Sequence, residues 1–368
     1  MKRPRPPYAL AVVVAGLALV ACGRARVDRG DTARCGHVQT TRSVRGVSLC
    51  EDAWACERPP GGPLDRVSLT RIAPCGDLTG PLALYLPDRH HNGDVRGTDA
   101  RSDLRLYLAQ AGIRTWGLGY RTHARMLGGA AGAAPSDWTF DTFADDVQWA
   151  MGFIRGAEAS RGIWLVAAGD GATFAYEMAR RGEPLLAGIV AVDGAAVAAP
   201  APGGGALLEP TLPGLSWERH RALVERAADA PRSASPVPGY ATAGEALAAH
   251  LYAAEGSGGP AAPSAARDRS ADVGAVARYL AAEDRWWPRA LLRSDMPGRG
   301  KRTLPVLAFA AGRRGADWIR IVRESAERFG GERAVVRVLP QAGHLDTLVG
   351  FAAPHQVYEP LRAFITSH

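Results

Sequence analysis

Few residues in this sequence have the type and setting needed for chemistry, and they lie far apart in the chain. The stretch IWLVAAGDGATFAYEMA, residues 163–179, joins an apolar run, a glycine-rich turn and a helical pattern. Asp170 lies in this turn, where its carboxylate could act as a nucleophile. It could instead open the helix, because the N-terminus of a helix stabilises a negative charge by roughly 0.3–1 kcal/mol. His344, in the turn GHLD at residues 343–346, supplies an imidazole that could activate it or a water molecule.

Segments of strand and helix type alternate around these residues. Strands are predicted over residues 66–73, 81–87, 113–120, 163–167, 187–192, 304–310 and 334–339, and helices over residues 103–112, 140–155, 172–180, 318–329 and 357–366. This alternation is typical of an α/β protein with a mostly parallel central sheet flanked by helices. Residues 195–300 break the rhythm with linkers rich in Gly and Pro and with predicted helices at 217–228, 243–254 and 273–280, so we expect a helical lid insertion there.

Four segments in this order resemble the α/β-hydrolase fold over roughly residues 60–368. LYLAQAGIRTWGLGYRTH resembles the helix and strand that follow the oxyanion loop, and WTFDTFADDVQWAMGFIR resembles the helix before the nucleophile strand. IWLVAAGDGATFAYEMA resembles the nucleophile elbow, and LPQAGHLDTLVG resembles the loop that carries the catalytic histidine. The resemblance implies the chain order of nucleophile, acid and histidine.

The elbow departs from that family at its central position, because Gly169 falls where the family has serine. A glycine has no atom with which to attack a carbonyl, and it relieves the strain of a positive φ, a strain on the order of 1–3 kcal/mol. Placing Asp170 at the tip instead would turn the following helix by about 100°. It would also move Ala175 and Ala179 out of register. We therefore expect Asp170 to open the helix rather than to act as the nucleophile.

Two further elements of the resemblance also depart from the family pattern. In the oxyanion loop Pro87-Asp88 stands where the family has His-Gly, and Arg89 follows; a carboxylate there would oppose the negative charge that develops during acyl transfer. The acid is expected near Gly315, and Asp317 follows two residues later. Asp193 is an alternative acid at the end of a strand, but we expect it to be a turn residue.

The N-terminus carries the marks of an exported lipoprotein. Lys2, Arg3 and Arg5 precede an apolar run over residues 9–20 that is too short to span a bilayer comfortably. The run ends at Cys22 in a sequence that resembles a lipobox. We expect residues 1–21 to be a signal peptide, Cys22 to be lipidated, and the protein to lie in the bacterial cell envelope, at the outer rather than the inner membrane.

Four more cysteines lie in the N-terminal part of the chain, three of them in segment 22–60, which we expect to be a tether, and one at the start of domain 61–368. In an exported chain they predict two disulfides, each stabilising by roughly 2–4 kcal/mol, and three pairings are open. They are Cys35, Cys50, Cys56 and Cys75. No metal site is predicted, because no CxxC pair is present. His90 and His91 are adjacent and are expected in a solvated loop.

The charge and composition exclude one large class of function. The formal net charge is +7, but the positive residues form no basic run with interleaved aromatic residues, which argues against nucleic-acid binding. We therefore expect a membrane-anchored hydrolase-fold protein without the usual serine and without a cofactor, which binds a small apolar or acyl ligand or a protein partner. The alternatives are an active hydrolase of esters, epoxides or haloalkanes that uses Asp170 with His344, and a purely structural envelope lipoprotein.

Overall fold

The computed structural model describes residues 35–368, except 45–46, 77–78, 95–96, 98, 124–136, 159–161, 202–204, 211, 213 and 255–271. The predicted signal peptide and Cys22 lie outside the described residues. Among the described residues, no helix is both long and apolar enough to cross a membrane.

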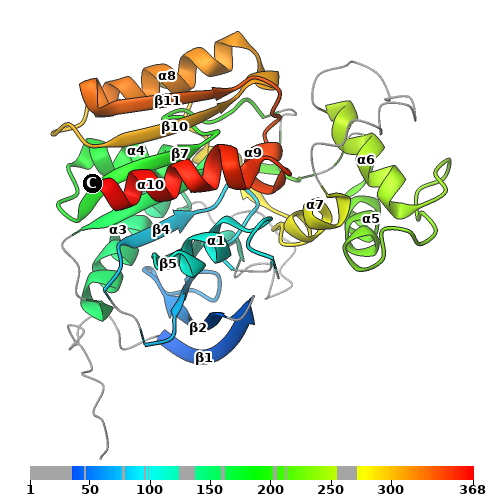
Figure 1. Cartoon of the computed structure of the whole chain (residues 1–368), viewed down its shortest axis with the longest axis horizontal. Coiled ribbons are helices and arrows are strands. Elements are labelled where there is room, and N and C mark those ends of the chain that lie inside the picture. Colours follow the sequence, from blue (N-terminus) through cyan, green and yellow to red (C-terminus); the bar gives the residue numbers. More distant parts are fainter. Residues whose placement is uncertain are drawn as a thin grey trace, which may run out of the picture.

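One large sheet organises the chain (Figure 1). Its nine strands are β1 (Cys35–Val44), β2 (Val47–Glu57), β3 (Arg66–Pro74), β4 (Leu82–Leu86), β5 (Arg114–Gly119), β6 (Ile163–Ala168), β7 (Leu186–Val192), β10 (Val306–Ala311) and β11 (Ala334–Leu339), in the order β1-β2-β3-β5-β4-β6-β7-β10-β11. The ladders from β5 to β11 are parallel, and those that join β1, β2, β3 and β5 are antiparallel. The predicted mostly parallel sheet is confirmed.

Helices cover both faces of the sheet, because β4, β6 and β10 are buried on both sides and need an apolar layer over each. One layer contains α3 (Phe140–Ala157), α4 (Gly171–Arg181) and α8 (Ala316–Gly330), whose apolar residues share a core cluster. The other contains α1 (Leu104–Gln110) and α10 (Glu359–Ser367), with the short α9 (Asp346–Val349) before it.

The three lid helices lie between β7 and β10 in the chain. They are α5 (Trp217–Asp229), α6 (Ala243–Ala254) and α7 (Val273–Leu280), and Figure 1 shows them beside the end of the core where α9 lies. Their apolar residues, among them Leu223, Leu247 and Val276, join the same core cluster as Leu348 and Val349 of α9. The lid is therefore packed onto the core at the edge where the turns after the parallel strands gather.

The segment expected to be an irregular tether is instead a hairpin of the main sheet. β1 and β2 pair over their whole length, β2 pairs with β3, and the Trp54 ring stacks on Trp116 of β5 at 4.8 Å. The prediction failed because pairing with an adjacent strand and cross-links can order a segment that has no hydrophobic period of its own.

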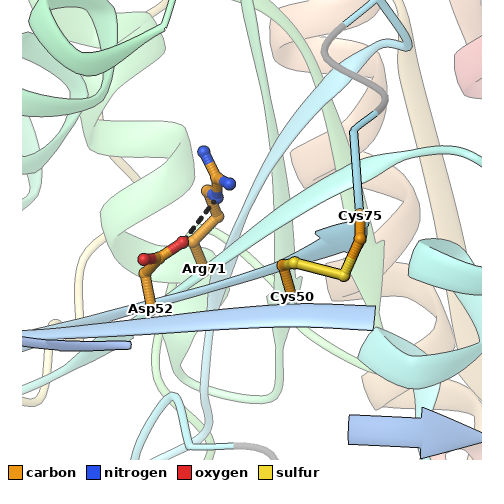
Figure 2. The surroundings of a disulfide bond; sticks show 4 residues. All are labelled: Cys50, Asp52, Arg71 and Cys75. Carbon is orange, nitrogen blue, oxygen red and sulfur yellow. Dashed lines mark ion pairs between the residues drawn. A yellow bond between two sulfur atoms is a disulfide. The ribbon is translucent and has the colours of Figure 1, made fainter. Parts of the chain in front are cut away.

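Both predicted disulfides are present, and the structure resolves their pairing. Cys35 bonds to Cys56, its direct partner in the β1–β2 ladder, across a Cα–Cα distance of 4.2 Å. Cys50 of β2 bonds to Cys75 just after β3, and the neighbouring Asp52–Arg71 ion pair links the same two strands at 3.2 Å (Figure 2).

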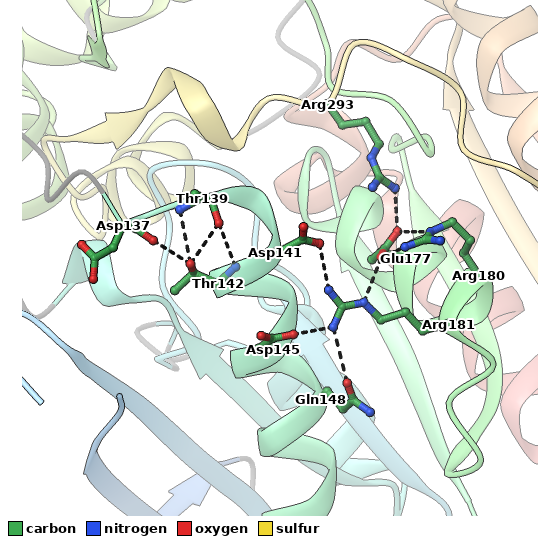
Figure 3. Close-up of polar contacts among 10 residues, drawn as sticks. All are labelled: Asp137, Thr139, Asp141, Thr142, Asp145, Gln148, Glu177, Arg180, Arg181 and Arg293. Carbon is green, nitrogen blue, oxygen red and sulfur yellow. Dashed lines mark hydrogen bonds and ion pairs between the residues drawn. The ribbon is translucent and has the colours of Figure 1, made fainter. Parts of the chain in front are cut away.

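An ion-pair cluster fixes the helix that follows the elbow. Glu177 of α4 is fully buried and accepts hydrogen bonds from Arg180, Arg181 and Arg293. Arg181 also reaches Asp141 of α3, at 3.0 Å (Figure 3). Because α4 begins directly after the elbow, this cluster helps to hold the turn in place.

Candidate functional site

Gly169 forms the tip of the turn between β6 and α4. Its φ is +47°, a conformation that glycine adopts without the penalty other residues incur, and its N–H donates to the carbonyl of Val192 on the neighbouring strand. The next residue, Asp170, is already helical, with φ −68° and ψ −17°. Gly169, and not Asp170, therefore stands at the tip of the turn.

A second residue fills the space above this glycine. A Cβ built on Gly169 would lie 2.2 Å from Cγ and Oδ1 of Asp88, distances that no pair of non-bonded atoms can tolerate. Asp88 reaches this point from the loop that directly follows β4. A side chain at the tip and the carboxylate of Asp88 are therefore mutually exclusive in this geometry.

The Asp88 carboxylate also occupies the backbone anion site of the elbow. Its Oδ1 accepts hydrogen bonds from the N–H groups of Asp170, at 2.6 Å, and of Arg89, at 2.8 Å. Two convergent N–H groups of this kind form an oxyanion hole, one from the residue after the tip and one from the oxyanion loop. The two N–H groups converge here in the same way, and a carboxylate of the protein itself accepts both hydrogen bonds.

His344 completes a chain of three side chains that begins at Asp88. Its Nε2 lies 3.0 Å from Oδ2 of Asp88, and its Nδ1 lies 2.7 Å from Oδ2 of Asp193. Asp193 is fully buried and accepts further hydrogen bonds from the N–H of Ala311 and from Nε1 of Trp318. The chain Asp88–His344–Asp193 thus has the connectivity of a triad with a carboxylate at the nucleophile end.

The expectation that Asp193 is only a turn residue is therefore wrong. It adopts φ +48°, rare for a residue other than glycine, and this conformation accompanies the contact between its carboxylate and His344.

Asp317, the expected acid, does not make this contact. A 3-10 turn over Gly312–Arg314 precedes α8, and Asp317 lies in the first turn of that helix with its side chain 95% exposed, 3.6 Å from Arg320. Gly315, where the resemblance places the acid, is the residue directly before α8. Both ring nitrogens of His344 are already engaged by other carboxylates.

The carboxylate of Asp170 is held by groups other than those that contact His344. Its carboxylate is buried, lies 3.0 Å from Nε of Arg89, and accepts a hydrogen bond from the N–H of Ala199. Burial raises the pKa of Asp170 to about 6, against the opposing charge of Arg89. Asp170 opens α4 as predicted, although its side chain makes no capping hydrogen bond, and the alternative that pairs it with His344 has no support in this geometry.

The protonation of His344 follows from its partners. Carboxylates only accept hydrogen bonds, so an imidazole between two ionised carboxylates must carry protons on both nitrogens. Burial alone would lower the pKa of His344, but the hydrogen bonds to Asp193 and Asp88 and their charges raise it to about 10. Burial would raise the pKa of Asp88, but the hydrogen bond from His344 and the charges of His344 and Arg89 hold it well below its usual range.

The site is therefore a balanced set of charges rather than a poised base. Its carboxylates are Asp88, Asp170 and Asp193, and its cations are His344, Arg89 and Arg314, the last lying 3.0 Å from Asp193. The three negative and three positive charges balance, so these groups can share a largely buried volume in which an unpaired charge would be costly. An imidazolium cannot accept a proton from a nucleophile, so this resting state lacks a general base.

A small cavity of about 70 Å³ lies between α7 of the lid and the core, and its lining residues include neither Asp88 nor His344. Tyr85, three residues before Asp88, and Tyr279 of α7 line it, together with Leu348 and Val349 of α9. Burial raises the pKa of Tyr85, and the charges of Asp103 and then Asp88 add to this. The side chains of Asp88 and His344 are 15% and 23% exposed.

The loop after Asp88 is not solvated, contrary to expectation. His90 and His91 are both buried, because the lid closes over them: His91 stacks on Tyr279 at 4.2 Å and Nδ1 of His90 lies 3.1 Å from the carbonyl of Asp284. Burial lowers the pKa of His90 to about 3, so its ring is neutral. Within the described part of the chain, no group of three or more His, Cys, Asp or Glu residues could hold a metal ion.

Comparisons with known proteins bear on the fold. No protein-family model matches the sequence, and no curated protein matches it. Among solved structures, a candidate lipase from Sulfolobus solfataricus superposes with a TM-score of 0.67 at 19% identity, over 91% of this chain and 99% of that chain. An α/β-hydrolase fold protein from Nakamurella multipartita superposes with a TM-score of 0.50 at 13% identity, over 90% of this chain and 99% of that chain. The chain has the α/β-hydrolase fold.

Proposed function

We propose that this protein is a lipid-anchored envelope protein that has kept the α/β-hydrolase fold but does not transfer acyl groups, and that it binds a small ligand beside its former catalytic centre. One observation supports this above all others: the Asp88 carboxylate stands over Gly169 and fills the oxyanion hole.

Three requirements of ester hydrolysis are unmet in this site. The tip lacks a nucleophilic atom, the two N–H groups that would hold the oxyanion are engaged by Asp88, and His344 is charged. Each requirement alone contributes a large factor; the loss of one oxyanion donor, for example, typically costs about 100- to 1,000-fold in kcat. Acyl transfer from this arrangement is therefore expected to be undetectable.

The envelope location and the ligand complete the proposal. Two disulfides suit an exported protein, and the expected lipid at Cys22 would attach it to a membrane, for which acyl chains on that residue suffice. The cavity between α7 and the core combines apolar groups of Leu104, Leu348 and Val349 with polar and charged groups, among them Tyr85, Asp103 and Arg278, which suits a small molecule with an apolar part and a polar part.

The test is a comparison of acyl-ester hydrolysis by the wild type and by designed variants. We expect no turnover of p-nitrophenyl acetate or butyrate, and no labelling by a fluorophosphonate, for the wild type or for Gly169→Ser alone. Asp88→Gly combined with Gly169→Ser vacates the hole and supplies the hydroxyl, so labelling should appear at residue 169. Wild-type ester turnover that is abolished by His344→Ala would contradict the proposal.

The anchor is tested separately. Cells expressing the full chain should release the protein only with detergent, and Cys22→Ser should release it into the soluble envelope fraction. Equal membrane retention of the two forms would refute lipid anchoring at this cysteine.

A further inference from the structure

We propose that the cavity between α7 and the core binds a small zwitterionic amino acid, of about the size of alanine. This ligand class rests on the proposed function, which assigns a small ligand to the same cavity but does not identify it. Unpaired polar groups in the cavity and opposite charges on its two walls support it.

The lid contributes a cation to the cavity. Arg278, in the last turn of α7, lines the cavity together with its neighbour Tyr279 and is partly buried. Within the part of the chain that the structure describes, its guanidinium forms no ion pair and no hydrogen bond. A partly buried guanidinium without a carboxylate of the protein favours a ligand with an acidic group, because that group would supply the missing partner.

The core contributes an unpaired acceptor to the same cavity. His91 lines it, is only 7% exposed and stacks on Tyr279 at 4.2 Å. Its Nδ1 lies 3.2 Å from the carbonyl oxygen of Arg89, and a carbonyl only accepts, so Nδ1 carries the proton of the neutral ring. Nε2 is then an acceptor, and it is buried without a hydrogen-bond partner among the described residues. A buried acceptor is unfavourable when unpaired, so it favours a ligand that donates an N–H or O–H group.

The core wall of the cavity also carries negative charge. Asp103 lines it, and its carboxylate accepts hydrogen bonds from three backbone N–H groups at and before the start of α1. Asp94 is a second carboxylate in the lining. Burial raises the pKa of Tyr85, and the charges of Asp103 and Asp88 raise it further, so the potential at this wall is negative. A donor that carries a positive charge, such as an ammonium group, suits both this potential and the acceptor of His91.

The charge balance and the volume of the cavity limit the ligand further. Among the described residues that line it, Asp94 and Asp103 balance Arg105 and Arg278. A ligand with one positive and one negative group keeps this balance, whereas a simple anion or amine would add an uncompensated charge. The volume of about 70 Å³ holds about half a dozen non-hydrogen atoms, which is the size of alanine. The methyl group of alanine suits the apolar side chains that α9 contributes to the lining.

Isothermal titration calorimetry of the full chain in detergent, at slightly alkaline pH, tests this ligand class. Four probes of nearly the same size separate the two charges. L-alanine carries both, propionate lacks the ammonium group, isopropylamine lacks the carboxylate, and lactate has a hydroxyl in place of the ammonium group. We expect L-alanine to bind with a Kd in the millimolar range or below, and the other three about tenfold or more weakly. L-tryptophan should not bind, because it is too large for the cavity.

Three variants assign the contacts. Arg278→Gln should weaken L-alanine binding about tenfold, which removes its advantage over isopropylamine. His91→Phe keeps an aromatic ring on Tyr279 but removes the acceptor, so it should weaken L-alanine binding about tenfold and remove the advantage over propionate. Arg219→Gln replaces an exposed arginine of α5 in the same lid and is the matched control, with no expected change. Thermal unfolding of each variant verifies that it is folded.

Three outcomes would overturn the inference. L-alanine may not bind to the folded wild type even far above millimolar concentration, in which case the cavity holds water alone. L-alanine and lactate may bind equally, in which case the ammonium group is not recognised. L-alanine binding may survive both Arg278→Gln and His91→Phe, in which case it occurs elsewhere.

The probes act on the unaltered protein, so they decide the question even where a variant fails to fold. Wild-type hydrolysis of p-nitrophenyl esters would contradict the proposed function without changing the order of affinities of the four probes. The failure of the proposed function and the failure of this ligand class are therefore distinguishable.

Discussion

The contact between Gly169 and Asp88 makes a quantitative prediction about stability. Replacing Gly169 by alanine adds one methyl group, and the position of that methyl lies 2.2 Å from the Asp88 carboxylate. The Asp88 carboxylate is not a flexible side-chain end that can move aside, because its oxygens are held by two backbone N–H groups and by His344. The methyl can be accommodated only if Asp88 leaves the hole.

The expected cost has two separable parts. Alanine at φ +47° costs roughly 1–2 kcal/mol whatever surrounds it. Displacement of Asp88 is the second part, and because water can replace some of its hydrogen bonds, we count the loss of one bond to a charged group, about 1.5–3 kcal/mol. We expect Gly169→Ala to destabilise by about 3–5 kcal/mol in total. In an Asp88→Ala background only the conformational part should remain, which gives a coupling energy of about 2–3 kcal/mol.

Urea unfolding of the four members of this double-mutant cycle measures the coupling. Gly152→Ala is the matched control, because Gly152 lies within α3 with no atom close to its missing Cβ, and alanine there should stabilise by about 0.5–1 kcal/mol. Additive effects of Gly169→Ala and Asp88→Ala, within about 0.5 kcal/mol, would refute the reasoning that the carboxylate closes the tip.

Three further predictions concern charge and cross-links. Because the pKa of His344 is raised from 6.5 to about 10, its stabilising contribution is complete below pH 6.5 and is lost as the pH rises through 10. The stability advantage of the wild type over His344→Gln in urea unfolding should therefore shrink by up to about 4–5 kcal/mol between pH 6 and pH 10.5, and a constant difference would contradict the assigned charge. Cys50→Ser combined with Cys75→Ser should lower the free energy of unfolding by about 2–4 kcal/mol. Treating this double variant with a reductant should cause no further loss of stability through residues 50 and 75. Glu177→Ala should destabilise by about 3–5 kcal/mol because it leaves three arginines around a buried site, and a loss below 1 kcal/mol would show that the cluster in Figure 3 contributes little.

Sequence patterns predicted the fold well, because each buried strand and each amphipathic helix has a local signature. They also placed Gly169 at the tip, since small residues recur along α4 in the register that close packing against the sheet requires. Residues 35–57 were missed as strands because their order comes from pairing with β3 and from cross-links, which a hydrophobic period does not reveal.

The site was predicted less completely, for a physical reason. Asp88 was recognised as incompatible with acyl transfer, but nothing near it in the chain shows that its carboxylate reaches across to the N–H of Asp170, a residue 82 positions away. Asp193 and Asp317 are both single acidic residues near strand or helix ends, and only the turn before α8 decides which of them faces His344. One signal was available: a glycine at the tip and an acidic residue in the oxyanion loop are both unusual, and together they suggest one side chain taking the place of another.

That substitution also limits how the site could be converted to acyl chemistry. With any side chain at residue 169 the Asp88 carboxylate has no room, and with Asp88 in place the hole cannot accept an acyl oxygen. Neither Gly169→Ser nor Asp88→Gly alone can therefore produce an esterase, because the first collides with Asp88 and the second has no nucleophile. The removal of Asp88 also changes the charge of His344. The imidazole is left with Asp193 as its remaining carboxylate partner, so its pKa falls toward the range of a general base. The double variant changes sterics, oxyanion site and base together, so its gain of acyl transfer would far exceed the product of the two single changes.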